Sequence, residues 1–121
     1  MTKHEKKTLN GLLHEIVGFR DKRCLRCGNP KWQLSHIYPK GRYRRMEFEP
    51  ENVKALCYAC HLNWWHKNPI EAHEWLRLIY SKEKLDRLKL MSNTDQGRFD
   101  YKIHKLFLEN IISKHASAKY A

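Results

Sequence analysis

The sequence predicts an α+β domain in which helices flank a short two-stranded segment. Apolar residues follow the helical period before residue 21 and again after residue 57, whereas glycines and prolines interrupt the stretch between them. A cysteine pair lies at each end of that stretch. A chain of 121 residues has room for one hydrophobic core and not for two independent ones. We therefore expect a single domain at 1–121, with an N-terminal helix at 1–22, a core at 23–68 and a helical extension at 69–121.

The N-terminal helix is predicted over roughly residues 3 to 20. Its apolar residues recur at i, i+3, i+4, i+7 and i+8, which places them on one face: Leu9, Leu12, Leu13, Ile16 and Val17. Thr2 and Glu5 have the spacing of a capping box, in which each side chain bonds to the other residue's backbone N–H. Together, the start signal and the apolar face indicate an amphipathic helix.

The C-terminal half is also predicted to be helical. Pro69 suits the first turn of a helix, whose apolar face contains Ala72, Trp75, Leu76, Ile79 and Tyr80. Ser81 is expected to cap a second helix, and the polar segment at 93–97 to end it. A terminal helix follows, and its predicted core face consists of Ile103, Leu106, Phe107 and Ile111. We assign these helices packing roles, and they could also form a homodimer interface.

Two short strands are predicted in the middle segment, where the helical period is lost. The stretch WQLSHIY at 32–38 is the first predicted strand and YRRMEFE at 43–49 is the second. The basic turn PKGR at 39–42 is expected to join them into a hairpin.

The charge of the chain indicates its partner. Lys and Arg number 24 against 13 Asp and Glu, a net charge of +11 that is spread along the whole chain. Such a surface suits nucleic acid, because solubility alone is usually reached with a smaller net charge and with both signs of charge interspersed. No apolar run approaches the ~20 residues of a membrane span, and the start MTKHEKKTLN has no apolar signal segment. We therefore expect an intracellular protein without a membrane partner.

Four cysteines form two CxxC pairs, Cys24 with Cys27 and Cys57 with Cys60. In a reducing compartment, such pairs favour metal binding over disulfides. Two knuckles supply the four thiolates that a tetrahedral zinc takes, and Gly28 permits the tight turn after the first pair. The alternative is a thioredoxin-like redox site, which needs an α/β context that this chain does not offer. We expect a closed, structural Zn²⁺ site, so any catalytic metal must have other ligands.

The order of residues between and after the cysteines resembles a known family. The first CxxC is followed by SHI at 35–37 and then by ENVKALCYACH at 51–61. This order resembles the HNH endonuclease motif, in the subclass with two zinc knuckles, over residues 24–68. The stretch WWHKNPIEAHEW at 64–75 is similar to small phage HNH proteins, and phage Holliday-junction and recombination nucleases are more distantly similar. The resemblance implies a zinc-braced ββα-metal core with an N-terminal helix and a helical C-terminal extension.

The resemblance also implies roles for three residues. His36 corresponds to the general base that takes a proton from the attacking water, a task that suits an imidazole because its pKa lies near neutral pH. Asn52 corresponds to the asparagine that ties the loop to the hairpin and aims the histidine. His61 corresponds to a ligand of a catalytic Mg²⁺ or Mn²⁺, with Ni²⁺ or Zn²⁺ as substitutes because imidazole binds Mg²⁺ poorly. Taken singly, each residue would be an ordinary surface, packed or capping residue.

Two further residues are candidate ligands of the catalytic ion. Many relatives have Asp or His just before the general base, whereas this chain has Ser35, whose neutral hydroxyl binds a cation far less well. The other candidate is His66. In an α-helix, His66 lies about 140° around the axis from His61, and Trp65 shares the face of His61 instead. His66 is therefore expected to reach the ion only if the helix ends or distorts before Pro69.

A basic turn follows the candidate general base. Its side chains are predicted to contact DNA phosphates, although a solvated hairpin tip would have the same composition: Lys40, Arg42, Arg44 and Arg45. Trp64 and Trp65 are expected to pack the short helix on the hairpin, with base stacking as the alternative. Since no extended groove-reading motif is present, we expect weakly specific or structure-guided recognition of DNA.

These features predict a metal-dependent endonuclease that hydrolyses phosphodiester bonds in double-stranded or branched DNA. It would act in the cytoplasm, that of the host cell if a phage encodes it. The main alternative is a zinc-ribbon DNA-binding protein in which Ser35 marks a lost catalytic site. A redox protein with free reactive thiols is a third class. The natural target, the choice between a nick and a double-strand break, and the oligomeric state are left open.

Overall fold

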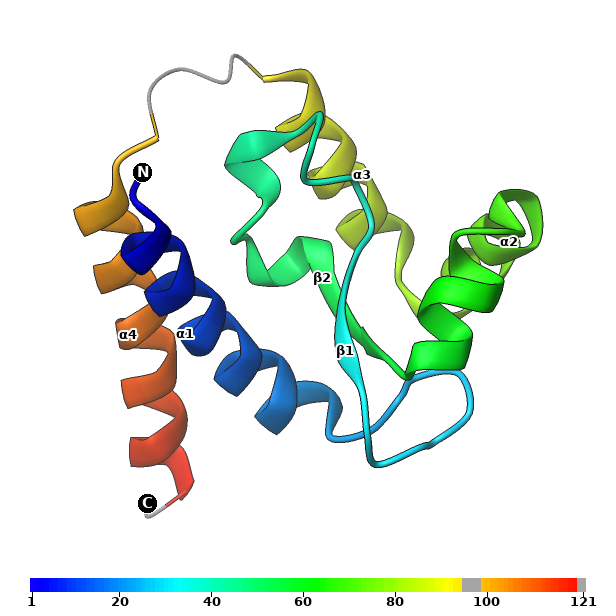
Figure 1. Ribbon diagram of the computed structural model, residues 1–121, viewed down its shortest axis with the longest axis horizontal. Helices are drawn as coiled ribbons and strands as arrows, with labels where there is room; N and C mark the ends of the chain where they lie inside the picture. Colours follow the sequence, from blue (N-terminus) through cyan, green and yellow to red (C-terminus); the bar gives the residue numbers. More distant parts are fainter. Residues whose placement is uncertain (95–98, 120–121) are drawn as a thin grey trace.

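The computed structural model describes residues 1–94 and 99–119. Figure 1 shows α1 and α4 side by side at one end, α2 at the other end, and the strands between them. The α-helices are α1 (Lys3–Asp21), α2 (Pro69–Ile79), α3 (Lys82–Asn93) and α4 (Tyr101–Lys119), and the strands are β1 (Gln33–His36) and β2 (Val53–Leu56). Two 3₁₀ helices, η1 (Arg44–Met46) and η2 (Pro50–Asn52), and a π-helix, η3 (Ala59–Trp65), complete the described part. The predicted α+β class is confirmed.

The N-terminal helix forms as predicted. Glu5 N donates to Thr2 Oγ1 at 3.0 Å, and Thr2 N donates to Glu5 Oε1 at 2.8 Å, which completes the capping box. The buried residues of α1 are Leu9, Leu13, Ile16 and Val17. They pack against Phe48, Val53, Ala55 and Leu108 in the first of two apolar clusters. This helix therefore supplies one wall of the core.

The predicted hairpin is wrong in its second strand. β1 lies within the predicted strand at 32–38, but its antiparallel partner is β2, with Ser35 opposite Lys54. The stretch at 43–49 contains η1 instead. Met46 and Phe48 are buried there, so the alternating pattern reflects the burial of every second side chain and not a hydrogen-bonded ladder. Residues 37–52 connect the strands, in place of a tight PKGR turn.

Long-range hydrogen bonds explain why β2 forms where it does. Ala55 N donates to Asp21 Oδ2 at 3.0 Å, and Arg20 donates to the carbonyl of Val53. Leu25 N donates to Ala55 O at 3.0 Å. These bonds satisfy the edge of β2 that faces away from β1, where unpaired backbone groups would otherwise be costly to bury. β2 is thereby held between the end of α1 and the first cysteine pair.

The starts of α2 and α3 agree with the prediction. α2 begins at Pro69, and the Oγ of Ser81 accepts a hydrogen bond from Lys84 N at 3.1 Å at the start of α3. α3 ends at Asn93, which is where the predicted break at 93–97 begins. Residues 95–97 of that break lie outside the described residues.

The predicted core face of α4 is wrong for Ile103, Leu106 and Phe107, and correct for Ile111. Leu108 is fully buried, whereas Ile103 and Leu106 are 67% and 66% exposed. Apolar residues of α4 form two overlapping stripes, and the stripe with Leu108, Ile111 and Ile112 packs into the cluster of α1. Which stripe is buried depends on how α4 lies against α1, and the sequence of α4 alone does not determine this.

The strands separate the two apolar clusters. Val53 and Ala55 belong to the cluster of α1 and α4, while Leu56 belongs to the second cluster. The buried residues of the second cluster are Cys24, Leu56, Cys57, Cys60, Trp64, Trp65, Ala72 and Leu76. Trp64 and Trp65 are thus core residues, as predicted. Within the described part of the chain, none of the helices has the length and apolar character that a membrane span requires.

Candidate metal centre and histidine pocket

The four cysteines lie together, with all Sγ atoms within 4.8 Å of one another. No disulfide joins them, and Cys27 Sγ lies 3.5 Å from Cys57 Sγ. Sulfurs about 3.8 Å apart surround a tetrahedral zinc when each Zn–S distance is about 2.3 Å. The donor set and its spacing therefore fit a zinc ion. Among the described residues, no other group of three or more His, Cys, Asp or Glu side chains is gathered in this way.

The surroundings of the cysteines combine burial, which disfavours a free thiolate, with hydrogen-bond donors to the sulfurs. Burial raises the pKa of the Cys60 thiol to about 12, so a bound cation would be needed to hold this sulfur as a thiolate at neutral pH. Arg26 Nη1 donates to Cys60 Sγ, and Cys60 N donates to Cys57 Sγ, both at 3.5 Å. Gly28 adopts a φ of +80°, a conformation that glycine tolerates. The tight turn predicted after the first pair is therefore present.

The chain leaves the second cysteine pair as a π-helix and not as an α-helix. His66 N donates to His61 O at 3.2 Å, a bond between residues five positions apart. This wider turn brings the rings of His61 and His66 to a centroid distance of 4.7 Å. An α-helix would have turned His66 away by about 140°. The helix therefore distorts before Pro69, which was the condition for His66 to lie beside His61.

One open pocket of about 510 Å³ contains the three histidines of the predicted site, His36, His61 and His66. The other residues that line it are Asn10, Leu34, Ile37, Pro39, Lys40, Gly41 and Trp65. His36 pairs with Val53 on the side of the sheet that faces α1, whereas His61 comes from η3 on the other side. The pocket therefore spans the edge of β1. None of the described residues that line it is acidic.

Hydrogen bonds determine which nitrogen of each imidazole is free. His36 Nε2 lies 2.8 Å from Glu47 O, and since a carbonyl only accepts, Nε2 carries the proton and Nδ1 is the basic nitrogen. His61 Nδ1 donates to Gln33 Oε1 at 2.9 Å, which leaves Nε2 available to an ion. Burial lowers the pKa of His36, and burial together with repulsion by neighbouring positive charge lowers the pKa of His61 to about 4. Both rings are neutral at pH 7.

Asn52 holds the loop that forms one wall of the pocket. Its side chain is fully buried, and Oδ1 accepts a hydrogen bond from Tyr38 N at 2.8 Å. Nδ2 donates to Tyr38 O at 3.1 Å and to Met46 O at 3.0 Å. These bonds tie residues 38–46 to the start of β2. Because Asn52 does not itself line the pocket, it is a positioning residue.

Ser35 lies apart from the histidine pocket. Its side chain is fully buried, and its hydroxyl accepts a hydrogen bond from Lys54 Nζ at 3.1 Å. Lys54 is also fully buried, with Nζ 3.3 Å from the centroid of the Trp65 ring. Burial lowers the pKa of Lys54 well below its usual value. Because this hydroxyl is bonded to Lys54 and Ser35 does not line the histidine pocket, we do not include Ser35 in the ligand set.

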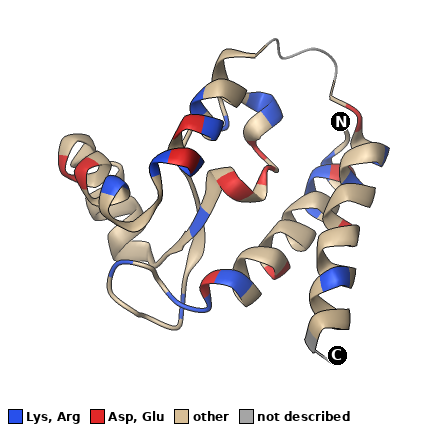
Figure 2. Cartoon of the chain, turned by 180° about the vertical axis from the view of Figure 1, so that it is seen from behind, with Lys and Arg blue, Asp and Glu red and all other residues tan. Residues whose placement is uncertain are grey.

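The predicted DNA-binding residues do not form a hairpin tip. All four are exposed on the connection between the strands: Lys40, Arg42, Arg44 and Arg45. Lys40 lines the histidine pocket, while Arg42 lines a neighbouring pocket. Figure 2 shows that basic residues also lie on α1, α3 and α4. Positive charge is therefore spread over the molecule and is not confined to the loop.

The histidine pocket does not fit Mg²⁺, which prefers oxygen ligands, because none of the described residues that line it supplies a carboxylate. The imidazoles of His61 and His66 fit Ni²⁺ or Zn²⁺ better than Mg²⁺ or Mn²⁺. His61 also donates its other ring N–H to an oxygen, Gln33 Oε1, as histidine ligands of metals usually do.

Two residues with contacts near the site, Gln33 and Lys54, were not predicted from the sequence. Gln33 orients His61 from a distant part of the chain, and only tertiary structure brings them together. Lys54 did leave a signal, because it is a lysine within the otherwise apolar strand VKAL. Comparisons of this chain with family models, with curated proteins and with solved structures gave no match. The site itself therefore carries the functional inference.

Proposed function

We propose that this protein is a zinc-braced DNA endonuclease that hydrolyses phosphodiester bonds in the pocket of His36, His61 and His66. The observation that carries the proposal is the pocket itself. It brings together a histidine of β1 with His61 of η3 and His66 at the end of η3, which are distant from β1 in sequence, beside a cysteine cluster that fits zinc. Lys40 lines the same pocket, and no acidic residue among those described lines it, which suits a phosphate.

His36 acts as the general base. Its Nε2–H is bonded to Glu47 O, so Nδ1 can accept a proton from the water that attacks phosphorus. Burial lowers the pKa of His36, which keeps the ring unprotonated at neutral pH. Glu47 O also restrains the ring, because rotation would break this bond. General base catalysis contributes about 10²–10⁴-fold to a rate.

His61 and His66 hold a divalent transition-metal ion, and Gln33 orients the ring of His61. Such an ion supplies positive charge against the phosphate when bound. A zinc ion on the four cysteines would brace the start of η3, since Cys60 directly precedes His61. The exposed basic residues of the loop contact neighbouring phosphates and so position the DNA.

The contact between Ser35 and Lys54 favours a second candidate function. In this alternative, the chain is a zinc-ribbon DNA-binding protein without nuclease activity, and Lys54 has taken the place of a metal-binding arrangement. The pocket would then bind a phosphate without cleaving DNA. Both candidates predict steep weakening of DNA binding by salt, so salt dependence does not distinguish them.

Nicking of supercoiled plasmid distinguishes the two candidates. Wild type, His36→Ala and His4→Ala are incubated with Zn²⁺, Ni²⁺, Mn²⁺ or Mg²⁺ in turn; His4 is an exposed histidine of α1 and serves as the matched control. We expect His4→Ala to nick like wild type and His36→Ala to nick at least about 100-fold more slowly while it still binds DNA. If wild type binds DNA but nicks with none of the four ions, the endonuclease proposal is wrong.

Metal analysis tests the cysteine centre separately. We expect about one tightly held zinc per chain, released when the thiols are modified. Four freely reactive thiols in a folded protein without zinc would instead favour the redox class.

A further inference from the structure

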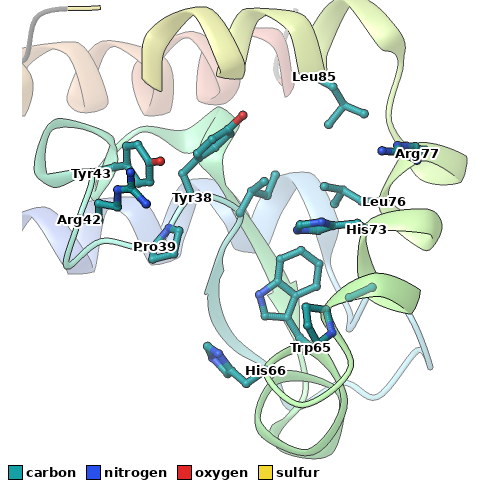
Figure 3. Close-up of a pocket in the computed structure, with 13 residues that line it drawn as sticks. Tyr38, Pro39, Arg42, Tyr43, Trp65, His66, His73, Leu76, Arg77 and Leu85 are labelled. Atoms are coloured by element: carbon teal, nitrogen blue, oxygen red, sulfur yellow. The ribbon is translucent and has the colours of Figure 1, made fainter. Parts of the chain in front are cut away.

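A second pocket adjoins the histidine pocket. It has a volume of about 500 Å³ and lies between α2 and the connection that follows β1 (Figure 3). Four residues line both pockets: Ile37, Pro39, Trp65 and His66. The two pockets therefore lie next to each other and share part of their walls. A ligand that extends from one to the other would pass Trp65 and His66.

Aromatic rings form part of the walls of this second pocket. Tyr38 and Tyr43 lie on one side, and their rings meet edge to face with centroids 5.2 Å apart. Trp65 and His73 border the open space from the other direction, with ring centroids 6.2 Å apart (Figure 3). Leu76 adds an apolar surface next to His73. A flat ligand with an aromatic face can stack on such walls.

Positive charge lies at both sides of the same pocket. Arg42 stands beside Tyr43, with its guanidinium carbon 5.4 Å from the ring centroid, and Arg77 stands on α2 across the open space (Figure 3). None of the described residues that line the pocket is acidic. The pocket thus complements a ligand that has a flat aromatic part next to a negative charge. A nucleotide combines a base and a phosphate in this way, and the volume falls within the range of small-ligand sites.

We propose that this pocket binds one unpaired nucleotide of the DNA strand whose backbone passes through the histidine pocket. The base stacks on the aromatic walls, and Arg42 and Arg77 contact the flanking phosphates. The inference rests on the proposed function in one respect, namely that DNA occupies the histidine pocket. A base within a duplex is stacked and paired, and moving it into a pocket costs free energy. The pocket therefore selects DNA with an unpaired base, such as a bulge, a single strand or a branch point.

Binding to two matched DNA molecules tests the proposal. One is a plain duplex, and the other is the same duplex with a single unpaired thymidine, each labelled for fluorescence anisotropy and titrated without added divalent ions. We expect wild type to bind the bulged duplex about 10-fold more tightly, which is in the lower part of the range for stacking one base on an aromatic side chain. The measured quantity is this ratio of affinities.

Variants assign the preference to the pocket. Tyr43→Ala removes an aromatic wall and should bring the ratio close to one, whereas Tyr43→Phe keeps the ring and should keep the ratio. Arg77→Gln should lower the ratio as well. Lys102→Gln removes the same charge at an exposed position of α4 and should leave the ratio unchanged. Because Arg77 is exposed, Arg77→Gln provides a test even if Tyr43→Ala does not fold.

The outcomes separate this pocket from the proposed nuclease. A wild-type ratio of one would overturn the nucleotide pocket, as would a ratio that neither Tyr43→Ala nor Arg77→Gln lowers. Plasmid nicking is measured in parallel, and His36→Ala should keep the preference for the bulged duplex because binding needs no cleavage. A preference without nicking would count against the endonuclease only, and nicking without a preference would count against the nucleotide pocket only.

Discussion

Replacing Asn52 with alanine removes three hydrogen bonds from the buried wall of the histidine pocket. The side chain accepts from Tyr38 N at 2.8 Å and donates to Tyr38 O at 3.1 Å and Met46 O at 3.0 Å. Each bond contributes about 1 kcal/mol net, and a buried backbone group left without a partner costs about 1–3 kcal/mol. We therefore expect Asn52→Ala to lower the free energy of unfolding by about 3–5 kcal/mol. That is a large fraction of the ~5–15 kcal/mol of a typical domain.

Urea unfolding followed by circular dichroism measures this loss, and limited trypsin digestion locates it. Residues 38–46 carry Lys40 and Arg42, so a loop released from β2 should be cut at these residues sooner than in wild type. Asn110→Ala, at an exposed position of α4, is the control and should change the stability by less than about 0.5 kcal/mol. Asn52→Asp keeps the shape but turns an oxygen toward two carbonyls, so it should also be destabilised.

A loss below about 1 kcal/mol for Asn52→Ala would refute this reasoning, because three buried bonds could not then be making their usual contribution. Unchanged cleavage by trypsin at Lys40 and Arg42 in a destabilised variant would show that Asn52 supports the core but does not hold the loop.

Three further predictions concern the buried lysine, the cysteine centre and the general base. Burial lowers the pKa of Lys54 well below 10.5, so the folded protein binds fewer protons than the unfolded chain between the two pKa values and stability should rise with pH over that range. Urea unfolding at several pH values measures this rise in the free energy of unfolding, and Lys54→Met should make the rise smaller. An unchanged pH dependence in Lys54→Met would contradict the prediction. Cys57→Ser should release zinc and remove hydrogen-exchange protection from residues 57–79 but not from α1, because Cys57 belongs to the second cluster; equal loss in α1 would contradict this. Since burial lowers the pKa of His36 below 6.5, the nicking rate should fall with acid only below pH 6.5, and a fall that begins well above 6.5 would argue against His36 as the base.

Local signals in the sequence were sufficient for several parts of this molecule. The capping box of Thr2 and Glu5, Pro69 at the start of α2 and Ser81 before α3 each act through bonds to residues a few positions away. Within each CxxC pair, the two intervening residues likewise determine how far apart the two sulfurs lie. Such features depend on short-range geometry, which residues a few positions apart determine by themselves.

Other features depended on contacts between distant segments. The partner of β1 was mistaken because Met46 and Phe48 alternate like strand residues, whereas Asp21 and Arg20 of α1 bind the edge of β2. Burial of the Leu108 stripe of α4 follows from its packing on α1. The resemblance to the HNH motif implied that His36 and His61 act together. The fold placed them in one pocket, brought His66 beside them through a π-helical turn and buried Lys54 against Ser35. Periodicity reports which side chains of an element prefer burial, but the free energy of packing between elements determines which neighbours they meet.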